Sequence, residues 1–155
     1  ASPHLMSGET YGKLVKTGRF VGIKDTTCTM PMIKEKIAVQ GDSSVLQANI
    51  PYLYDAYEAG ARGVIATPST CGTNLLVKMR AEFSSGDTES ARKTHQHICA
   101  LDNVLSNFCA SAKCLVKLQG CDMNWYTRSN HNLNAQFLKG MEVWYAWAKE
   151  NGLVL

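Results

Sequence analysis

The chain has little that would suit it to a membrane or to a nucleic acid. Its longest apolar stretches fall far short of the roughly 20 residues that span a bilayer, and residues 1–15 contain no apolar segment of the length that a signal peptide needs. The 16 lysines and arginines are spread out without a basic block, and the net charge is only +3. We therefore expect no nucleic-acid partner, no membrane partner and a cytoplasmic location.

The six cysteines form no C-x-x-C pair, and their spacing is irregular. In a domain of ordinary size this pattern is typical of reduced thiols in a cytosolic protein. Only HQHIC, at residues 95–99, looks like a set of metal ligands. In a helix His95 and Cys99 would share a face while His97 would point elsewhere, and no second ligand pair lies nearby. We predict an ordinary helix surface there and no metal site.

What the chain does have is an alternation of two kinds of segment, over 155 residues that are 45% apolar. Three short runs, rich in β-branched or apolar residues and bounded by turn formers, are predicted strands: RFVGIKD (19–25), SSVLQAN (43–49) and RGVIATP (62–68). Predicted helices lie beside them at residues 7–18, 30–39 and 51–60. Strands that alternate with helices indicate parallel βαβ units.

Capping signals support these helices. Ser7 is a candidate N-cap of the first helix and Gly18 its stop, while Pro51 and Gly60 fit the first turn and the C-cap of the third. The helix at 30–39 sets charged side chains between apolar ones; the apolar ones are Met30, Ile33 and Ile37, and the charged ones Lys34, Glu35 and Lys36.

After residue 68 the pattern becomes helical, with predicted helices at 73–86, 87–108, 111–120 and 134–152. The last of them has a predicted apolar face made of Phe137, Leu138, Met141, Tyr145 and Ala148. Three strands are too few for a closed parallel barrel, which needs eight strands and about 250 residues. They make either a small open sheet or the last units of a barrel whose first part lies outside this chain.

Lys24 stands directly behind an apolar run, where a buried strand would carry another apolar residue. Alternation along the strand puts Lys24 on the same face as Phe20 and Gly22, and Gly22 leaves space beside it. The carboxyl ends of parallel strands are where ligands bind in such folds. Burial favours the neutral form of a lysine amine, which can attack a ketone to form a Schiff base. The alternative is a strand-end lysine whose ammonium reaches water or pairs with Asp25.

The sequence around this lysine resembles the dihydrodipicolinate synthase/N-acetylneuraminate lyase family. The likeness runs in order through LMSGETYGKLVKTGRFVGIKDTT, VLQANIPYLYDAYEAGARGVIAT, SSGDTESARKTHQHICALDNVL, SAKCLVKLQG and TRSN. Strand-G-x-K followed by a polar loop is the Schiff-base lysine motif of that family, and Lys24 falls on it. AGARGVI matches the family's A-G-x-x-G-x-I entry into the last barrel strand.

The resemblance implies an α/β fold: the C-terminal part of a (β/α)8 TIM barrel, about strands 6–8, followed by a helical C-terminal extension. Residues 1–86 would be the last βα units, and residues 87–155 the last helices and extension of the same domain. It also implies a lyase or synthase that forms a lysine Schiff base with pyruvate or a 2-oxo acid, for aldol condensation or cleavage. Lys24 would be catalytic, and the substrate-binding residues would be Ala48, Ile65 and Thr26.

We further expect no metal and no cofactor, an aldehyde and a 2-oxo acid as small-molecule partners, and a homo-oligomer. Three tryptophans in the C-terminal part either contribute to contacts between subunits or cover the barrel's own helices; they are Trp125, Trp144 and Trp147. Cys28 and Cys71, in loops after strands, either help Thr26 to shape the aldehyde site or are ordinary loop residues.

Departures from the family pattern leave an alternative open. Ala48 stands where the family commonly has glycine, and Arg128–Ser129 stand where Arg-Pro is frequent. The family's proton-relay tyrosine and the hydroxyl residues that hold the pyruvate carboxylate belong to a part that this chain does not match. The alternative is therefore an inactive C-terminal fragment or a scaffolding subunit without turnover of its own.

Two other barrel classes fit the sequence less well. Metal-dependent carboxyltransferase and acyl-transferring synthase barrels also carry K-D-T at a strand end, but they need His-x-His on the following strand, which here ends LQAN. Phosphate-handling aldolases need a glycine-rich loop that opens a helix after the last strand, and TPSTCGTN has one glycine.

Overall fold

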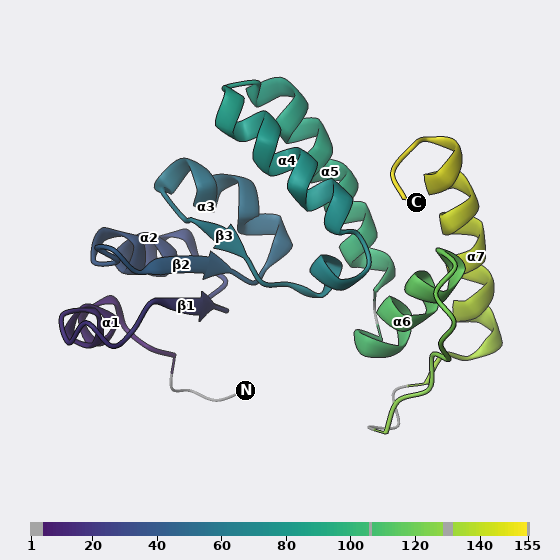
Figure 1. Cartoon of the computed structure of the whole chain (residues 1–155), viewed down its shortest axis with the longest axis horizontal. Coiled ribbons are helices and arrows are strands. Elements are labelled where there is room, and N and C mark those ends of the chain that lie inside the picture. Colours follow the sequence, from purple (N-terminus) through teal and green to yellow (C-terminus); the bar gives the residue numbers. More distant parts are fainter. Residues whose placement is uncertain (1–4, 106, 129–131, 155) are drawn as a thin grey trace. The chain divides into compact units, whose positions relative to one another are not determined.

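The computed structural model of the chain describes residues 5–105, 107–128 and 132–154, and its helices and strands follow the predicted alternation (Figure 1). The chain separates into two compact units, residues 1–66 and residues 67–155. The first unit holds α1 (Gly8–Val15), β1 (Gly22–Asp25), α2 (Met30–Ala38), β2 (Ser44–Gln47), the 3-10 turn η1 (Ile50–Tyr52), α3 (Leu53–Ala59) and β3 (Gly63–Val64). The second holds the 3-10 turn η2 (Thr67–Thr70), α4 (Thr73–Ser85), α5 (Thr88–Val104), α6 (Cys109–Leu118) and α7 (Ala135–Glu150).

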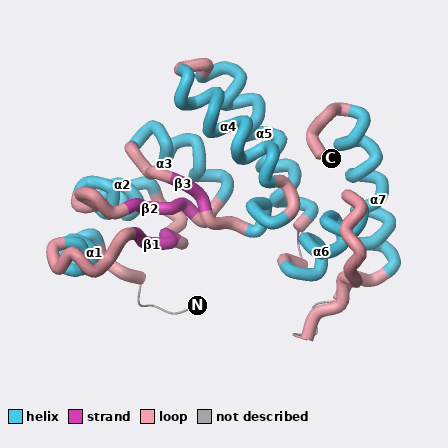
Figure 2. Tube along the Cα trace, in the orientation of Figure 1, coloured by secondary structure: helices cyan, strands magenta, loops and turns pink. Residues whose placement is uncertain are grey.

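The first unit is built on a parallel sheet in the order β1-β2-β3 (Figure 2). The strands have four, four and two residues, so they are shorter than predicted. The predicted third strand ran to Pro68, which instead lies in the 3-10 turn η2. Proline has no backbone N–H to donate to a strand ladder, which is why the pairing ends before it.

The two faces of this sheet differ in burial. Val45 and Gln47 of β2 are fully buried, while Ser44 and Leu46 between them are half-buried. Helix α2 packs on β2 and on α3, and residues such as Ile33 fill the layer between. One face of the sheet is therefore covered by helices, and no described residue of this unit forms a layer over the other.

The helix ends of the first unit mostly confirm the capping predictions. The side chain of Ser7 accepts a hydrogen bond from the Thr10 amide at 3.2 Å, as an N-cap does. Gly60 ends α3 with φ +108°, a conformation that favours glycine. Pro51 is not in the first turn of α3, because it lies in the 3-10 turn η1 that precedes the helix.

In the second unit, α4 and α5 lie side by side as a helical hairpin. Gly86 turns the chain with φ +84°, and Asp87 caps α5 by accepting a hydrogen bond from the Ser90 amide at 3.1 Å. The hairpin buries apolar side chains from both helices, among them Leu75, Met79, Ile98 and Leu101. The predicted boundary after residue 86 refers to a complete barrel and stays a prediction.

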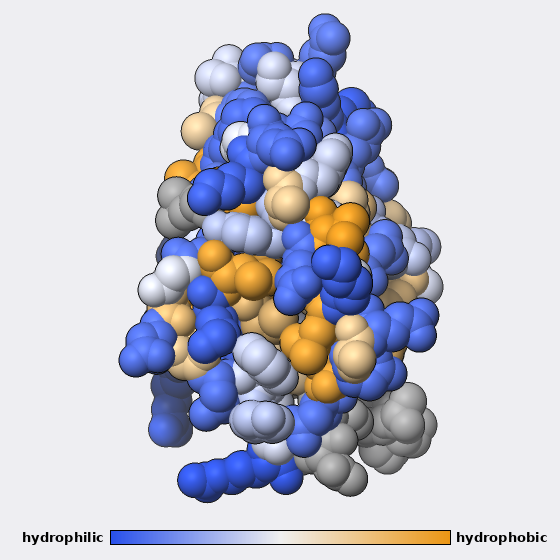
Figure 3. Space-filling model, turned by 90° about the vertical axis from the view of Figure 1, so that its right-hand side faces the viewer, coloured by the Kyte–Doolittle hydropathy of each residue, from blue (hydrophilic) through white to orange (hydrophobic). Residues whose placement is uncertain are grey.

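Helix α7 packs against α6 and buries only part of its predicted apolar face. Met141 and Ala148 are buried, while Phe137, on the same predicted apolar face, is 42% exposed. Val143 and Trp147 are also exposed. Figure 3 shows orange, apolar side chains among blue ones on the side where α7 lies in Figure 1. Among the described residues, no helix has the length and apolar character to cross a membrane.

Candidate active site

Lys24 lies on the uncovered face of the sheet, next to the carboxyl end of β1. The strand register pairs it with Leu46, which in turn pairs with Gly63, so these three residues share that face. The side chain of Lys24 is exposed and has no hydrogen bond or ion pair with any described residue. A Cβ atom at Gly22, two residues earlier, would lie 2.8 Å from the Ser44 carbonyl oxygen. Glycine is therefore needed there for the two strands to pair this closely.

The neighbouring carboxylate does not pair with Lys24. Asp25 points to the opposite, helix-covered face and is 2% exposed. One of its carboxylate oxygens lies 3.2 Å from the ammonium nitrogen of Lys36, which is also buried. The sequence left open whether Lys24 pairs with Asp25, and the structure gives that carboxylate a different partner. The Lys24 amine is left without a counter-ion from its own strand end.

The three predicted substrate contacts also lie at the carboxyl ends of the strands. Thr26 follows β1 directly and is exposed, and Ala48 follows β2. Ile65 follows β3 and is 43% exposed. Alternation puts Ala48 on the same face as Leu46. The structure thus brings Lys24 and these residues to one edge of the sheet, contributed by three consecutive strands.

Behind that edge lies a buried polar network that the sequence analysis did not predict. Lys36 reaches Thr27 Oγ1 at 3.4 Å as well as Asp25, and the Thr27 amide and hydroxyl both donate to Asp25 at 2.8–3.0 Å. The side-chain amide of Asn49 donates to the Thr27 carbonyl at 3.2 Å. Gln47 Oε1 accepts from the amides of the two residues that follow it. The loops after β1 and β2 are therefore tied together by side chains.

The sequence predicted only that Lys36 lies between the apolar positions of this helix. In the structure Lys36 is 1% exposed and belongs to the buried face. It follows the buried Ile33 by one helical turn, and the buried Gln40 comes one turn later. The spacing of Lys36 and Gln40, three and seven positions after the buried Ile33, is the sequence pattern that could have indicated their burial. A lone lysine in such a place is usually read as exposed, because lysine is almost never fully buried unless it is paired.

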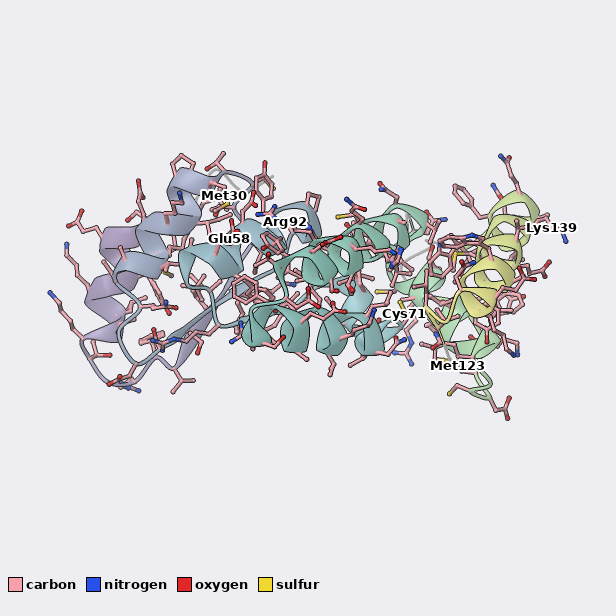
Figure 4. The ribbon with its side chains drawn as sticks, turned by 90° about the horizontal axis from the view of Figure 1, so that it is seen from above. Met30, Glu58, Cys71, Arg92, Met123 and Lys139 are labelled. Carbon is pink, nitrogen blue, oxygen red and sulfur yellow. The ribbon has the colours of Figure 1, made fainter. Side chains whose placement is uncertain are left out.

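All six cysteines are free thiols. Cys28 is exposed on the loop after β1, and its thiol lies 3.7 Å from the Thr26 carbonyl oxygen. Cys71, labelled in Figure 4, is buried in the second unit, where Gln119 donates to its carbonyl at 2.8 Å. Burial raises the pKa of the Cys71 thiol to about 11. Cys28 therefore lies at the same strand end as Lys24, and Cys71 is a protonated, packed thiol.

The HQHIC segment lies on α5 and has the predicted arrangement. His95 Nε2 and Cys99 Sγ lie 3.6 Å apart on one face of the helix. His97 points to another side, where burial, followed by the charges of Lys78 and Lys93, lowers its pKa. Across residues 5–105, 107–128 and 132–154, no three His, Cys, Asp or Glu side chains form a group that would suit a metal ion.

Three parallel strands that alternate with helices place this protein among the parallel α/β proteins. The open face near the strand ends, which carries an unpaired lysine amine, is its candidate site.

Comparison with known proteins gives the family. The Dihydrodipicolinate synthetase family matches residues 2–131. The 4-hydroxy-tetrahydrodipicolinate synthase of Hyphomonas neptunium is 29% identical over 105 residues, which are 66% of this chain and 35% of that protein. Dihydrodipicolinate synthase from Bacillus anthracis superposes with a TM-score of 0.85 at 21% identity, over 94% of this chain and 51% of that one. A prophage protein of the same family from E. coli K12, solved in complex with pyruvate, gives 0.81 at 17% identity, over 95% and 51%.

The chain belongs to the dihydrodipicolinate synthetase family. Its fold is the C-terminal part of the family's TIM barrel followed by helices, as the sequence predicted. The chain spans about half the length of these structures and about a third of the curated relatives. In the complete barrels the strands form a closed ring, and one face of each strand points to the barrel interior. The open face that carries Lys24 therefore corresponds to the barrel interior, which explains why a residue predicted to face a core is exposed in this chain.

Proposed function

We propose that this chain provides the Schiff-base lysine of a lyase or synthase that acts on pyruvate or a related 2-oxo acid. The observation that carries the proposal is the unpartnered amine of Lys24, on the uncovered face at the carboxyl end of β1. The curated relatives bear the name 4-hydroxy-tetrahydrodipicolinate synthase, and a structural relative was solved with pyruvate bound. Both are consistent with a 2-oxo acid as the ligand of this strand end.

In the proposed chemistry the unprotonated form of the Lys24 amine adds to the ketone carbon of the 2-oxo acid. The resulting carbinolamine takes up one proton and loses water, which leaves a protonated imine. The imine draws electrons from the adjoining carbon, which then gives up a proton and attacks the carbonyl carbon of an aldehyde. Hydrolysis of the product imine returns the amine and releases the aldol. Cleavage is the same sequence in reverse.

We assign the substrate contacts to Ala48, Ile65 and Thr26, beside Lys24. The Ala48 amide already donates to the Asp25 carbonyl at 2.9 Å, and the Ile65 amide donates to the Gln47 carbonyl at 2.9 Å. These two positions therefore offer the substrate their side chains and carbonyl oxygens rather than their N–H groups. The hydroxyl of Thr26, which is exposed, supplies a donor at the same edge.

The alternative is a chain that has the family fold but no turnover of its own. No residue of this chain is assigned to the proton relay or to the binding of the substrate carboxylate. A site that holds the nucleophile alone would bind or scaffold without efficient catalysis. Covalent capture of the 2-oxo acid tests the role of Lys24, and turnover by the complete protein separates the two functions.

The test is reductive trapping. The complete protein that contains these residues is treated with pyruvate and borohydride, and the adduct is located by peptide mass spectrometry. We expect the label on Lys24 and none in Lys24→Arg, because arginine stays protonated and is not a nucleophile. Lys34→Arg, an exposed position on α2, is the matched control and keeps the label. A label on another lysine, or none, rejects the assignment.

We also propose that α7 contributes to a homo-oligomer. Val143, Trp147 and Phe137 are exposed on it, and Trp144 and Trp147 lie with ring centres 6.4 Å apart beside a shallow hollow of about 530 Å³. Large apolar side chains of this kind are enriched at interfaces. Lys139 lines that hollow (Figure 4), whereas Lys149, exposed on the same helix, does not and is a matched control position. Sedimentation of the complete protein should show dissociation for Trp147→Ser and none for Lys149→Ser; a monomeric wild type at micromolar concentration contradicts the proposal.

A further inference from the structure

The buried lysine of α2 is an unusual feature of the first unit. Lys36 is 1% exposed, and Asp25 and Thr27 are equally covered at 2% and 1%. Taking a charge out of water is costly unless it is paired and hydrogen-bonded. Replacing a buried ion pair with well-packed apolar residues is often neutral or even favourable for stability. Stability alone is therefore a weak reason for a chain to keep this pair.

The three side chains form a closed triangle. The Lys36 ammonium lies 3.2 Å from Asp25 Oδ1 and 3.4 Å from Thr27 Oγ1. The Thr27 hydroxyl donates to both carboxylate oxygens of Asp25, at 2.8 and 3.0 Å, and its amide donates to Oδ1 at 3.0 Å. Each member contacts the other two, so the backbone from Asp25 to Thr27 is held at both ends.

The triangle extends to the neighbouring strand end. The Thr27 carbonyl accepts from Asn49, and the Asp25 carbonyl accepts from the Ala48 amide at 2.9 Å. Ala48 is a proposed substrate contact, and Thr26 lies inside the held segment. The buried side of the sheet therefore fixes the loops that present the proposed site on the open side.

Lys24 is the residue next to Asp25, and its side chain leaves the strand on the opposite face. Because Asp25 is anchored to α2, the direction of the Lys24 side chain is set as well. Alternation along the strand also points the Asp25 carboxylate away from Lys24, so it does not act as counter-ion to the lysine beside it. The amine is therefore aimed at the open face and not tied to this carboxylate.

We propose that Lys36, with Asp25 and Thr27, is a positioning residue for the Lys24 amine. Lys36 acts through Asp25 and Thr27, which hold the β1 strand end and the loop after it in place. The inference rests on the proposed function of Lys24, and it assigns a role to a buried lysine on a different element.

The experiment measures the rate of pyruvate trapping at Lys24 over a range of pyruvate concentrations, in the complete protein. Lys36→Met keeps the length of the side chain and removes its charge, and Lys34→Met makes the same change at an exposed position of α2. We expect the maximal trapping rate of Lys36→Met to fall at least about tenfold, because small misplacements of a reacting group cost that much or more. The half-saturating pyruvate concentration should change far less. Lys34→Met should trap as the wild type does.

A second pair of variants covers the case in which Lys36→Met does not fold. Thr27→Val keeps the shape of the side chain and removes the hydroxyl, while Thr27→Ser retains it. We expect slower trapping for Thr27→Val and near wild-type trapping for Thr27→Ser, both at a temperature where circular dichroism shows each variant folded. Equal rates for these two variants would overturn the role of Thr27 in the triangle.

The outcomes separate this inference from the proposed function. If the wild type is labelled at Lys24 and folded Lys36→Met is labelled at the same rate, the positioning role is wrong and the proposed function stands. If the wild type is not labelled at all, the proposed function fails. Acetylation of Lys24 by acetic anhydride then decides the inference by itself. Slower acetylation in Lys36→Met means that loss of Lys36 changes the setting of the Lys24 amine, and equal rates remove the positioning role.

Discussion

The two faces of the three-stranded sheet differ in whether the lysine side chain beside them is buried and paired. On the covered face, Lys36 is buried with a carboxylate and a hydroxyl within 3.4 Å. On the open face, Lys24 is exposed and has no partner among the described residues. A lysine that serves structure is thus paired and packed, and one that is available for chemistry is left free. The comparison gives a physical reason to choose between two lysines that lie on consecutive elements, β1 and α2.

The largest expected effect is on the catalytic rate, when the 155-residue chain is expressed alone with its open face uncovered. Expressed alone, the 155-residue chain has the amine and lacks a positioned proton relay, whose loss typically costs about 10²–10⁴ in rate. We expect pyruvate release from a panel of 2-oxo-3-deoxy acids to be at least about a hundredfold slower than in the complete protein. Free strand edges should also make the chain self-associate in sizing experiments. A monomer that turns over at about 1 s⁻¹ or faster would break the comparison.

The next effect contrasts the two lysines directly. Lys36→Met leaves Asp25 as a buried, unpaired carboxylate, and removing one partner of a buried pair costs about 3–5 kcal/mol. Lys24→Met changes an exposed side chain, for which the expected cost is within about 0.5 kcal/mol. Urea unfolding of both variants measures the difference. Equal destabilisation would mean that Lys24 is packed as well as Lys36.

Two glycines sharpen the contrast on the open face itself. A Cβ at Gly22 would lie 2.8 Å from a backbone oxygen, that of Ser44, which cannot move without shifting the strand. A Cβ at Gly63 would meet the end of the Leu46 side chain at the same distance. We expect Gly22→Ala to cost about 1–3 kcal/mol and Gly63→Ala less than about 1, because Leu46 is half-exposed and can turn aside. Thermal unfolding of the two variants should show this order, and the reverse order would contradict the close approach at Gly22.

The smallest expected effect is on the alkylation rate of a cysteine thiol, not on stability. Burial raises the pKa of Cys71 to about 11, against an ordinary value of 9.0. Only the thiolate reacts, so at pH 8 Cys71 should alkylate about a hundredfold more slowly than an ordinary thiol. Its rate should rise about tenfold for each pH unit up to that pKa. Iodoacetamide labelling with peptide mapping reports it against Cys28, which is exposed beside the open face. Similar rates for the two at pH 8 would show that Cys71 is not buried.

The parts of this fold that sequence predicts well are those set by local chemistry. Ser7, Gly60 and Asp87 cap helices where their residue types favour it. Lys24 was singled out because alternation in a short strand and the polar loop after it need no tertiary information. The order of strands and helices follows from the same local patterns.

The parts that were missed depend on what lies across the fold. Lys36 reads as a surface residue until Asp25, eleven positions earlier in the chain, is placed beside it by the turn from β1 into α2. The apolar stripe of α7 tells which side of the helix is apolar, but not how much of it a neighbour covers, and Phe137 stays exposed. The end of β3 depends on strand pairing, which no residue of that segment determines alone.

The helical hairpin of α4 and α5 has a consequence for how the chain folds. Its contacts join residues on either side of one tight turn at Gly86, whereas Gly22 of β1 must find Ser44 across an entire helix. Contacts close in sequence form in microseconds to milliseconds, and parallel strand pairing is slower because a long loop must close first. When the whole chain refolds from denaturant, the hairpin should therefore form before the strands pair. Until they pair, the unpaired strand edges are the part of the chain most open to association with another chain.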